Sequence, residues 1–108
     1  MTAHERISGL LGLAYRARKT ICGDFAAENH LKKHTVPMLF LACDGGSDNV
    51  EKYRRLAKRK GIAVVDIFTK QELGQAVGKM QNVVVLLIDT GFAKAIAKVM
   101  QAMDKGGN

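Results

Sequence analysis

Apolar residues recur along the chain in two patterns, one with a helical period and one in short unbroken runs. The helical period is clearest at Ile7, Leu10, Leu11, Ala14 and Tyr15. Where apolar positions return every three or four residues, we expect helices over 3–17, 25–33, 49–60, 70–77 and 92–103. The short apolar runs predict strands over 20–22, 36–42, 63–68 and 83–88.

Polar side chains mark where these helices begin. Thr2 with Glu5, and Thr69 with Glu72, have the spacing of a capping box, in which the two side chains bond each other's backbone N–H groups. The remaining expected N-caps are Asp24 for the second helix and Ser47 or Asp48 for the third.

Strands therefore alternate with helices, which predicts an α/β protein with one sheet covered by helices on both faces. The length of 108 residues fits one compact domain over residues 1–108, and we expect 103–108 to fray. The longest apolar run, Val83–Ile88, is far shorter than the about 20 residues that cross a bilayer. The N-terminal residues also lack the pattern of a signal peptide. We therefore expect a cytoplasmic protein with no membrane partner.

The charge balance gives the first indication of function. There are 17 Lys and Arg against 10 Asp and Glu, for a net charge of +7, and so basic a domain is a candidate nucleic-acid binder. One cluster consists of Arg16, Arg18 and Lys19. A larger one consists of Lys52, Arg54, Arg55, Lys58, Arg59 and Lys60. We interpret the larger cluster as the solvated face of a surface helix, which could add a second, non-specific phosphate contact.

Candidate catalytic and metal-binding residues are few. Asp44, Ser47 and Asp48 follow a buried strand, at a position where α/β sheets often bind ligands. No phosphate-binding glycine motif or nucleophile elbow accompanies them, so a helix-capping turn explains them better. His30 and His34 have the spacing of metal ligands, but the two lysines between them would repel a cation. We expect no enzyme, no cofactor and no metal.

The residues around Gly23 are consistent with a phosphate-binding surface, and the alternative is a solvated basic rim. Gly23 and Asp24 lead the chain into the second helix, whose N-terminus presents unpaired N–H groups and the positive end of the helix dipole. Lys32 and Lys33 lie further along that helix. Because the chain has only two Tyr and four Phe, mostly at core positions, structured RNA is a better partner than single strands.

Three segments carry a resemblance to a known family. They read GLAYRARK over 12–19, LFLACD over 39–44 and ELGQAVG over 72–78. In this order, and with Gly23 between the first two, they resemble the L7Ae/L30e ribosomal protein family, especially its short bacterial YlxQ-type branch, over about residues 5 to 99. The resemblance implies a three-layer α/β/α sandwich with a mixed four-stranded sheet. It also implies binding of structured RNA, often kink-turns, without a cofactor.

The family's RNA-facing motif, G-x-N-E-x-x-K, falls at the start of the second helix. Gly23 matches it, but Phe25, Ala26 and Asn29 replace the Asn, Glu and Lys, so kink-turn reading of the usual kind does not follow. Phe25 could stack on a base or pack inward, and we expect inward packing. Arg18 stands where the bacterial branch tends to have Gly, which adds a charge but strains a helix end.

We therefore expect an RNA-binding accessory of translation or ribosome assembly, monomeric when free, that docks on structured RNA such as ribosomal RNA or a kink-turn-like fold. The alternative is a protein-interaction module of the ribosome that does not read RNA specifically. The loop after ELGQAVG is a second contact region of the family. The expected RNA-binding residues are Arg16, Arg18, Lys19, Gly23, Asp24, Phe25, Asn29, Lys32, Lys33, Lys79, Met80, Gln81 and Asn82.

Overall fold

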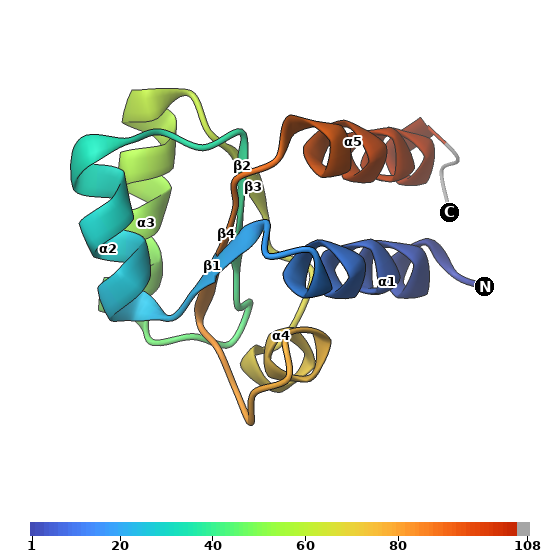
Figure 1. Ribbon diagram of the computed structural model, residues 1–108, viewed down its shortest axis with the longest axis horizontal. Helices are drawn as coiled ribbons and strands as arrows, with labels where there is room; N and C mark the ends of the chain where they lie inside the picture. The colour runs from blue at the N-terminus through green and yellow to red at the C-terminus, as the bar shows by residue number, and fades with distance from the viewer. Residues whose placement is uncertain (106–108) are drawn as a thin grey trace.

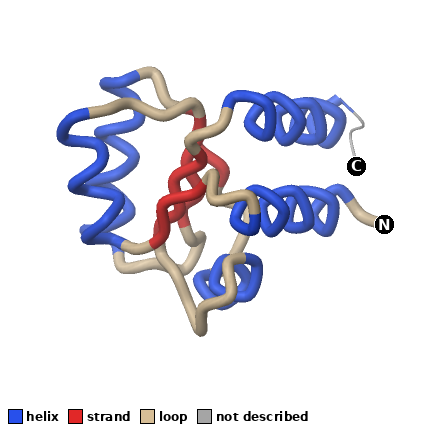
Figure 2. The backbone as a smooth tube through the Cα atoms, in the orientation of Figure 1, coloured by secondary structure: helices blue, strands red, loops and turns tan. Residues whose placement is uncertain are grey.

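Five helices and four strands build the described part of the chain, residues 1–105 of a computed structural model (Figures 1 and 2). Their order is α1 (Ala3–Arg16), β1 (Thr20–Cys22), α2 (Asp24–Lys33), β2 (Met38–Leu41), α3 (Ser47–Lys60), β3 (Ala63–Val65), α4 (Lys70–Ala76), β4 (Val84–Leu87) and α5 (Thr90–Lys105). This order confirms the alternation predicted from the apolar pattern. None of these helices is long and apolar enough to span a membrane.

The four strands form one mixed sheet in the order β1-β4-β2-β3. β4 pairs antiparallel with both β1 and β2, whereas β2 pairs parallel with β3. β1 is therefore an edge strand, and the register pairs Thr20 with Leu87 and Cys22 with Val85. The β1 edge runs from the end of α1 to the start of α2.

The helices cover both faces of this sheet (Figure 1). Helices α1, α4 and α5 pack on one face against the side chains of Phe40, Val85 and Leu87. Helices α2 and α3 pack on the other face against the alternate residues of the same strands, such as Leu39 and Leu86. Both faces are buried, which explains why β2 and β4 appear in the sequence as unbroken apolar runs. The three-layer α/β/α sandwich is confirmed.

Two predicted helix starts are correct and two are wrong. The capping boxes of Thr2 with Glu5 and of Thr69 with Glu72 are both present. Asp24 does not cap α2, and neither Ser47 nor Asp48 caps α3, because glycines occupy the N-cap positions. At the other end of the chain, α5 continues to Lys105, past the predicted end at residue 103; the rest of the predicted frayed tail, 106–108, lies outside the described residues.

The predicted strand over 63–68 is shorter and less buried than expected. β3 ends at Val65, and Ala63 is exposed while Val65 is buried. β3 is the second edge of the sheet, and an edge strand buries fewer of its side chains than a central one. Its apolar composition alone could not reveal this position.

Candidate nucleic-acid interface

The first group of predicted RNA-binding residues lies where α1 passes into β1. Arg16, Arg18 and Lys19 are all exposed. Arg16 and Arg18, together with Tyr15 and Thr20, line a shallow hollow beside the edge strand. We call Arg16, Arg18 and Lys19 the α1–β1 cations.

Arg18 adopts a left-handed backbone conformation with φ of +61°. Helix α1 ends in a Schellman motif, in which the Lys19 N–H bonds the Ala14 carbonyl at 2.8 Å and the Arg18 N–H bonds the Tyr15 carbonyl at 3.0 Å. Glycine is preferred at the left-handed position of this motif because a Cβ is strained there. The structure therefore supports the strain predicted from the sequence. Strain of this kind persists most often at functional positions.

Arg18→Gly is expected to stabilise the protein. The left-handed conformation costs a non-glycine residue about 1–2 kcal/mol, and the greater freedom of unfolded glycine offsets about 0.5–1 kcal/mol of the gain. We expect the free energy of unfolding to rise by about 0.5–1 kcal/mol in urea melts. Arg16→Gly, in the last turn of α1, is the matched control and should lose about 1 kcal/mol. Destabilisation by Arg18→Gly would contradict the assigned strain.

The second group begins at Gly23, the N-cap of α2. Gly23 has a φ of +94°, and its N–H donates to the Val84 carbonyl at 3.1 Å, which extends the ladder between β1 and β4. It offers no side chain to cap the helix. The first N–H groups of a helix have no partner within the helix, so the start of α2 presents backbone donors and a positive dipole end at the sheet edge.

The Asp24 side chain is directed toward α3 instead of capping α2. Its carboxylate accepts a short hydrogen bond from the Tyr53 hydroxyl, which also lies 2.9 Å from the Asp24 carbonyl. Lys52 Nζ lies 3.5 Å from Asp24 Oδ1 and 3.3 Å from Glu28 Oε1. Partial burial acts to lower the pKa of Lys52, but the hydrogen bond to Glu28 and the two carboxylate charges raise it overall. These contacts anchor the start of α2 on α3.

The solvent face of α2 carries the next predicted residues. Phe25, Asn29, Lys32 and Lys33 are exposed and recur at helical spacing, while Ala27 and Leu31 are buried. The expected inward packing of Phe25 is wrong, because its side chain is 82% exposed. The inward positions one turn apart are taken by Ala27 and Leu31, so Phe25 falls on the opposite side of the helix.

The third group is the α4–β4 loop, residues 79–82. Lys79, Met80 and Gln81 are exposed, and Met80 is 92% exposed. Asn82 is buried, and its side-chain Nδ2 has no hydrogen-bond partner among the described residues. Helix α4 delivers the loop through a second Schellman motif, in which the Lys79 N–H bonds the Gly74 carbonyl at 2.7 Å and Gly78 is left-handed.

The fold brings only some of these predicted residues together at one end of the sheet. The bond from Gly23 to Val84, two residues after Asn82, places the start of α2 beside the loop's end. The Tyr15 ring packs against Gly78, with Cε2 3.7 Å from the position of an added Cβ, and so joins the end of α1 to the loop's start. Lys19 lies at the opposite end of β1, about 13 Å from Gly23 at 3.3 Å per residue. Lys32 and Lys33 lie at the far end of α2.

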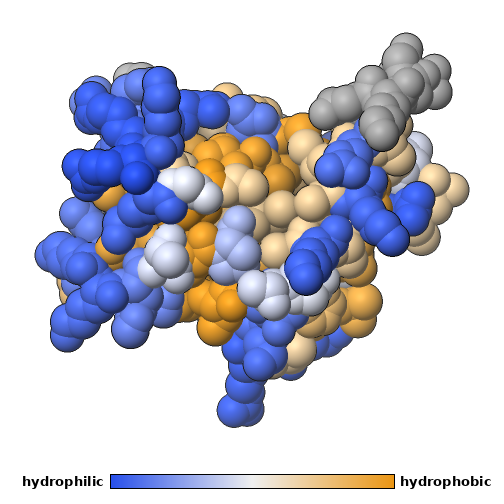
Figure 3. All heavy atoms as spheres, turned by 90° about the horizontal axis from the view of Figure 1, so that it is seen from above, coloured by the Kyte–Doolittle hydropathy of each residue, from blue (hydrophilic) through white to orange (hydrophobic). Residues whose placement is uncertain are grey.

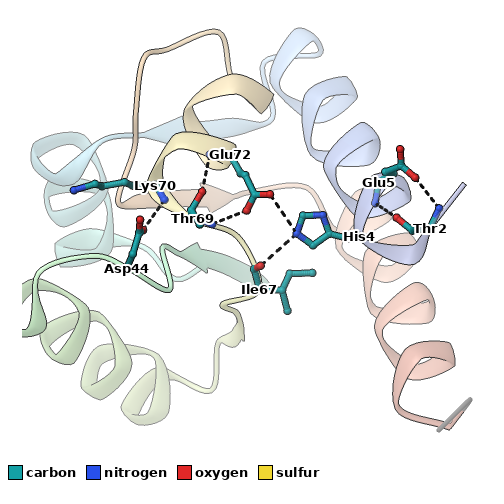
Figure 4. A network of polar contacts seen from close by, with 8 residues as sticks. All are labelled: Thr2, His4, Glu5, Asp44, Ile67, Thr69, Lys70 and Glu72. Atoms are coloured by element: carbon teal, nitrogen blue, oxygen red, sulfur yellow. Dashed lines mark hydrogen bonds and ion pairs between the residues drawn. The ribbon is translucent and has the colours of Figure 1, made fainter. Parts of the chain in front are cut away.

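Asp44, one of the candidate catalytic residues, helps to fix the start of α4 (Figure 4). Asp44 Oδ1 accepts a hydrogen bond from the backbone N–H of Lys70 at 2.8 Å, at the first residue of α4. His4 Nε2 lies 3.3 Å from the Ile67 carbonyl and 3.8 Å from Glu72 Oε2, which ties α1 to the start of α4. In Figure 4 the Asp44–Lys70 bond lies on one side of the Thr69–Glu72 capping box, and the contacts of His4 lie on the other side.

The spacing of His30 and His34 brings their rings together, with centroids 4.9 Å apart. Burial, and secondarily the charge of His34, lower the pKa of His30. Within residues 1–105 no group of three or more His, Cys, Asp or Glu side chains is placed to hold a metal ion. The two histidines thus have no third ligand of these kinds in the described part of the chain.

Fold and surface define a small, basic α/β/α sandwich with an exposed sheet edge, an uncapped helix start and a cationic helix end. The chain belongs to the Ribosomal protein L7Ae/L30e/S12e/Gadd45 family, whose model matches residues 5–98. This confirms the resemblance seen in the three sequence motifs.

Relatives and solved structures agree with this membership. The chain is 28% identical to the RNA-binding protein YlxQ of Bacillus subtilis, covering 84% of this chain and 91% of that one. The Enterococcus faecium protein of the same name is 25% identical, with 90% and 93% covered. A Bacillus halodurans protein of unknown function superposes with a TM-score of 0.81 at 29% identity, covering 88% and 96%. The Giardia lamblia 15.5kD RNA binding protein shares the fold, with a TM-score of 0.75 at 16% identity, covering 95% and 88%.

Sequence reasoning missed the residues that position the site. Tyr53 and Lys52 hold Asp24 across 29 and 28 positions of sequence, and Tyr15 supports Gly78. The helical period of the sequence places Tyr53 only on the inward face of α3. A tyrosine at a core position does signal a buried hydroxyl that needs a partner, but the partner itself cannot be identified without the fold.

Proposed function

We propose that the chain binds structured RNA, specifically ribosomal RNA, as an accessory of translation or ribosome assembly. Two relatives that cover most of the chain are named RNA-binding proteins. The net charge of +7 supports a polyanionic partner. The protein would act without a cofactor or catalytic step, in the cytoplasm, as a monomer when free.

One observation carries this proposal: the uncapped start of α2 lies between the α4–β4 loop and the edge strand that leads from the α1–β1 cations. In the proposed complex the RNA backbone follows this edge. Arg16, Arg18 and Lys19 hold phosphates, and the first N–H groups of α2 receive another acceptor. Asp24 contributes by anchoring the helix, because its carboxylate is engaged with α3.

Phe25 changes how such a site would read a base. In the family motif an asparagine at this position offers an amide, whereas Phe25 offers an exposed ring. Aromatic rings in RNA-binding proteins stack on bases that have left the helix stack. We therefore assign Phe25 to stacking on an unpaired base of a bulge or loop, which tolerates different bases more readily than hydrogen bonding does.

Replacing Arg16, Arg18 and Lys19 together with alanine should weaken RNA binding. Loss of up to three phosphate contacts is expected to reduce the slope of log affinity against log salt by about two to three units and affinity about tenfold near 0.15 M salt. Filter-binding titrations with purified ribosomal RNA measure both. Arg6 near the start of α1 and Lys94 and Lys98 on α5, all exposed, provide a control triple with the same charge change. Equal losses in the two triples would reject this site.

The second candidate function is a protein-interaction module of the ribosome that does not read RNA specifically. The exposure of Phe25 and Met80 favours it, because large apolar side chains in solvent often mark protein contacts. A ribosomal protein that remains bound to the chain after nuclease treatment, combined with no measurable affinity of the pure chain for ribosomal RNA, would favour this candidate over the first.

A further inference from the structure

A second concentration of positive charge lies away from the edge of β1, where α2 and α3 end. The two helices run in the same direction: Lys52 contacts Asp24 and Glu28 near the start of α2, and Arg59 and Lys60 share a groove with Lys32 near its end. Their C-terminal ends therefore lie together. We give the name helix-end cluster to six cations in the last turns of these two helices, three of which, Lys32, Arg59 and Lys60, line the shared groove. The other three are Lys33, Arg55 and Lys58, and all three are exposed.

Figure 3 views the molecule from this end and shows hydrophilic side chains massed over α2 and α3, beside an apolar centre. The cluster includes a groove floored by Leu31 and Leu56, with Lys32, Arg59 and Lys60 on its sides. Glu28 also lines the groove, but Lys52 neutralises it at 3.3 Å. The groove is thus a cationic channel between two helices.

Charge compensation within the protein does not account for the cluster. Of the ion pairs formed among the described residues, those on α3 use Lys52 and Arg54, and none uses a member of the cluster. Two helix C-termini contribute about −0.5 charge each, or about one negative charge against six cations. These six residues are about a third of the 17 Lys and Arg of the chain.

We propose that the helix-end cluster binds the phosphate backbone of a double-helical RNA segment. This inference rests on the proposed RNA-binding function and adds a second contact surface to it. Single strands are held by stacking on aromatic rings, and none of the residues that line the groove is aromatic. Phe25 lies eight residues from Lys33, about 12 Å along α2. A duplex is recognised mainly through shape and phosphates, which is what lysines and arginines on a grooved surface can contact.

In this proposal the two surfaces contact different parts of one RNA. The start of α2 and the edge of β1 would take the irregular part of the RNA, and the helix-end cluster would take an adjoining helix. The anchoring of α2 on α3 through Tyr53 and Lys52 keeps the two sides of the groove in fixed register. An RNA that combines a bulge or loop with a flanking duplex would engage both surfaces.

The test compares Arg55, Lys58 and Arg59 changed together to glutamine with the control triple Arg6, Lys94 and Lys98 changed to glutamine. All six are exposed, both changes remove three charges, and glutamine keeps helix propensity. The probe is a plain RNA duplex of about 16 base pairs. We expect about a tenfold loss of affinity and a salt slope lower by about two to three units for the α3 triple, against at most about a twofold loss for the control.

The outcomes separate this inference from the proposed function. Equal losses in the two glutamine triples, or no loss in the α3 triple, would overturn the helix-end site. If alanines at the α1–β1 cations still weakened binding to ribosomal RNA, the proposed function would then stand alone. If the α3 triple lost duplex binding while the α1–β1 alanines left ribosomal RNA binding unchanged, the helix-end site would stand and the proposed edge site would fail.

Discussion

Gly74→Ala is expected to destabilise the protein by about 2 kcal/mol and to displace the α4–β4 loop. A Cβ on Gly74 would lie 2.6 Å from both Cα and N of Gln81 and 2.7 Å from the carbonyl carbon of Met80. These are backbone atoms of a loop that cannot move aside by rotating a side chain. Overpacking of this kind costs about 3 kcal/mol, and the higher helix propensity of alanine returns at most about 1 kcal/mol.

Gly9→Ala is the matched control for this substitution. Gly9 also lies inside a helix, α1, but an added Cβ there meets nothing within 4 Å. The control should gain about 0.5–1 kcal/mol from helix propensity alone, so the two changes have opposite signs in a urea melt. Binding to ribosomal RNA should fall in Gly74→Ala, because Met80 and Gln81 move, and stay constant in Gly9→Ala. Equal stability of the two variants would show that the loop does not rest on α4.

The apolar pattern was sufficient to predict the helices and strands because local signals agree with the tertiary arrangement, whereas the mixed four-stranded sheet was implied by the family resemblance. Apolar runs marked the central strands β2 and β4, where both faces are covered, and two capping boxes marked the starts of α1 and α4. The two wrong helix starts share a glycine at the N-cap position, and for α2 the structure shows where the expected cap is used instead. Asp24 has a better partner in Tyr53 than in its own backbone, and this partner comes from another helix. Such a choice depends on packing, which local spacing does not encode.

The candidate site could be predicted as a set of segments but not as a surface. The pattern located the end of α1 and the start of α2, and the family resemblance added the loop after α4; the structure shows that the last two meet beside Val84. The pattern predicted the short strand between Lys19 and Gly23 but could not show that it is an edge strand, because strand order is a property of the whole sheet. It also could not show that Phe25 points outward, since an apolar residue in the first turn of a helix can lie on either side.

The largest charge run has a different meaning once the helices are placed. In sequence it is a property of α3 alone, and a solvated face explains it. In the structure the end of α2 contributes Lys32 and Lys33 to the same end of the molecule. Lys52 and Arg54 form ion pairs with carboxylates and so do not belong to the helix-end cluster. Two segments about 25 residues apart therefore share one phosphate-binding surface in our proposal.

Tyr53→Phe is expected to lower the free energy of unfolding by about 2 kcal/mol. The Tyr53 side chain is fully buried, and its hydroxyl bonds the Asp24 carboxylate and lies 2.9 Å from the Asp24 carbonyl. A hydrogen bond to a charged group contributes about 1.5–3 kcal/mol, and its loss leaves Lys52 as the remaining side-chain partner of the carboxylate among the described residues. Tyr15→Phe, which keeps a half-buried ring beside Gly78, is the matched control and should change stability by less than about 0.5 kcal/mol.

The same substitution predicts a change in alkaline stability and in RNA binding. Burial, followed by the hydrogen bond and charge of Asp24, raises the pKa of Tyr53. The protonated phenol is therefore the form that the folded state stabilises, so its contribution is complete below the ordinary tyrosine pKa of about 10 and is lost as the pH rises further. Urea melts between about pH 8 and 11 should show this loss in the parent protein and not in Tyr53→Phe.

Because Tyr53 anchors the start of α2 to α3, Tyr53→Phe should also weaken ribosomal RNA binding at neutral pH while Tyr15→Phe does so less. A Tyr53→Phe protein as stable as the control would show that α2 is held by its apolar residues alone, and the positioning role of Tyr53 would be rejected.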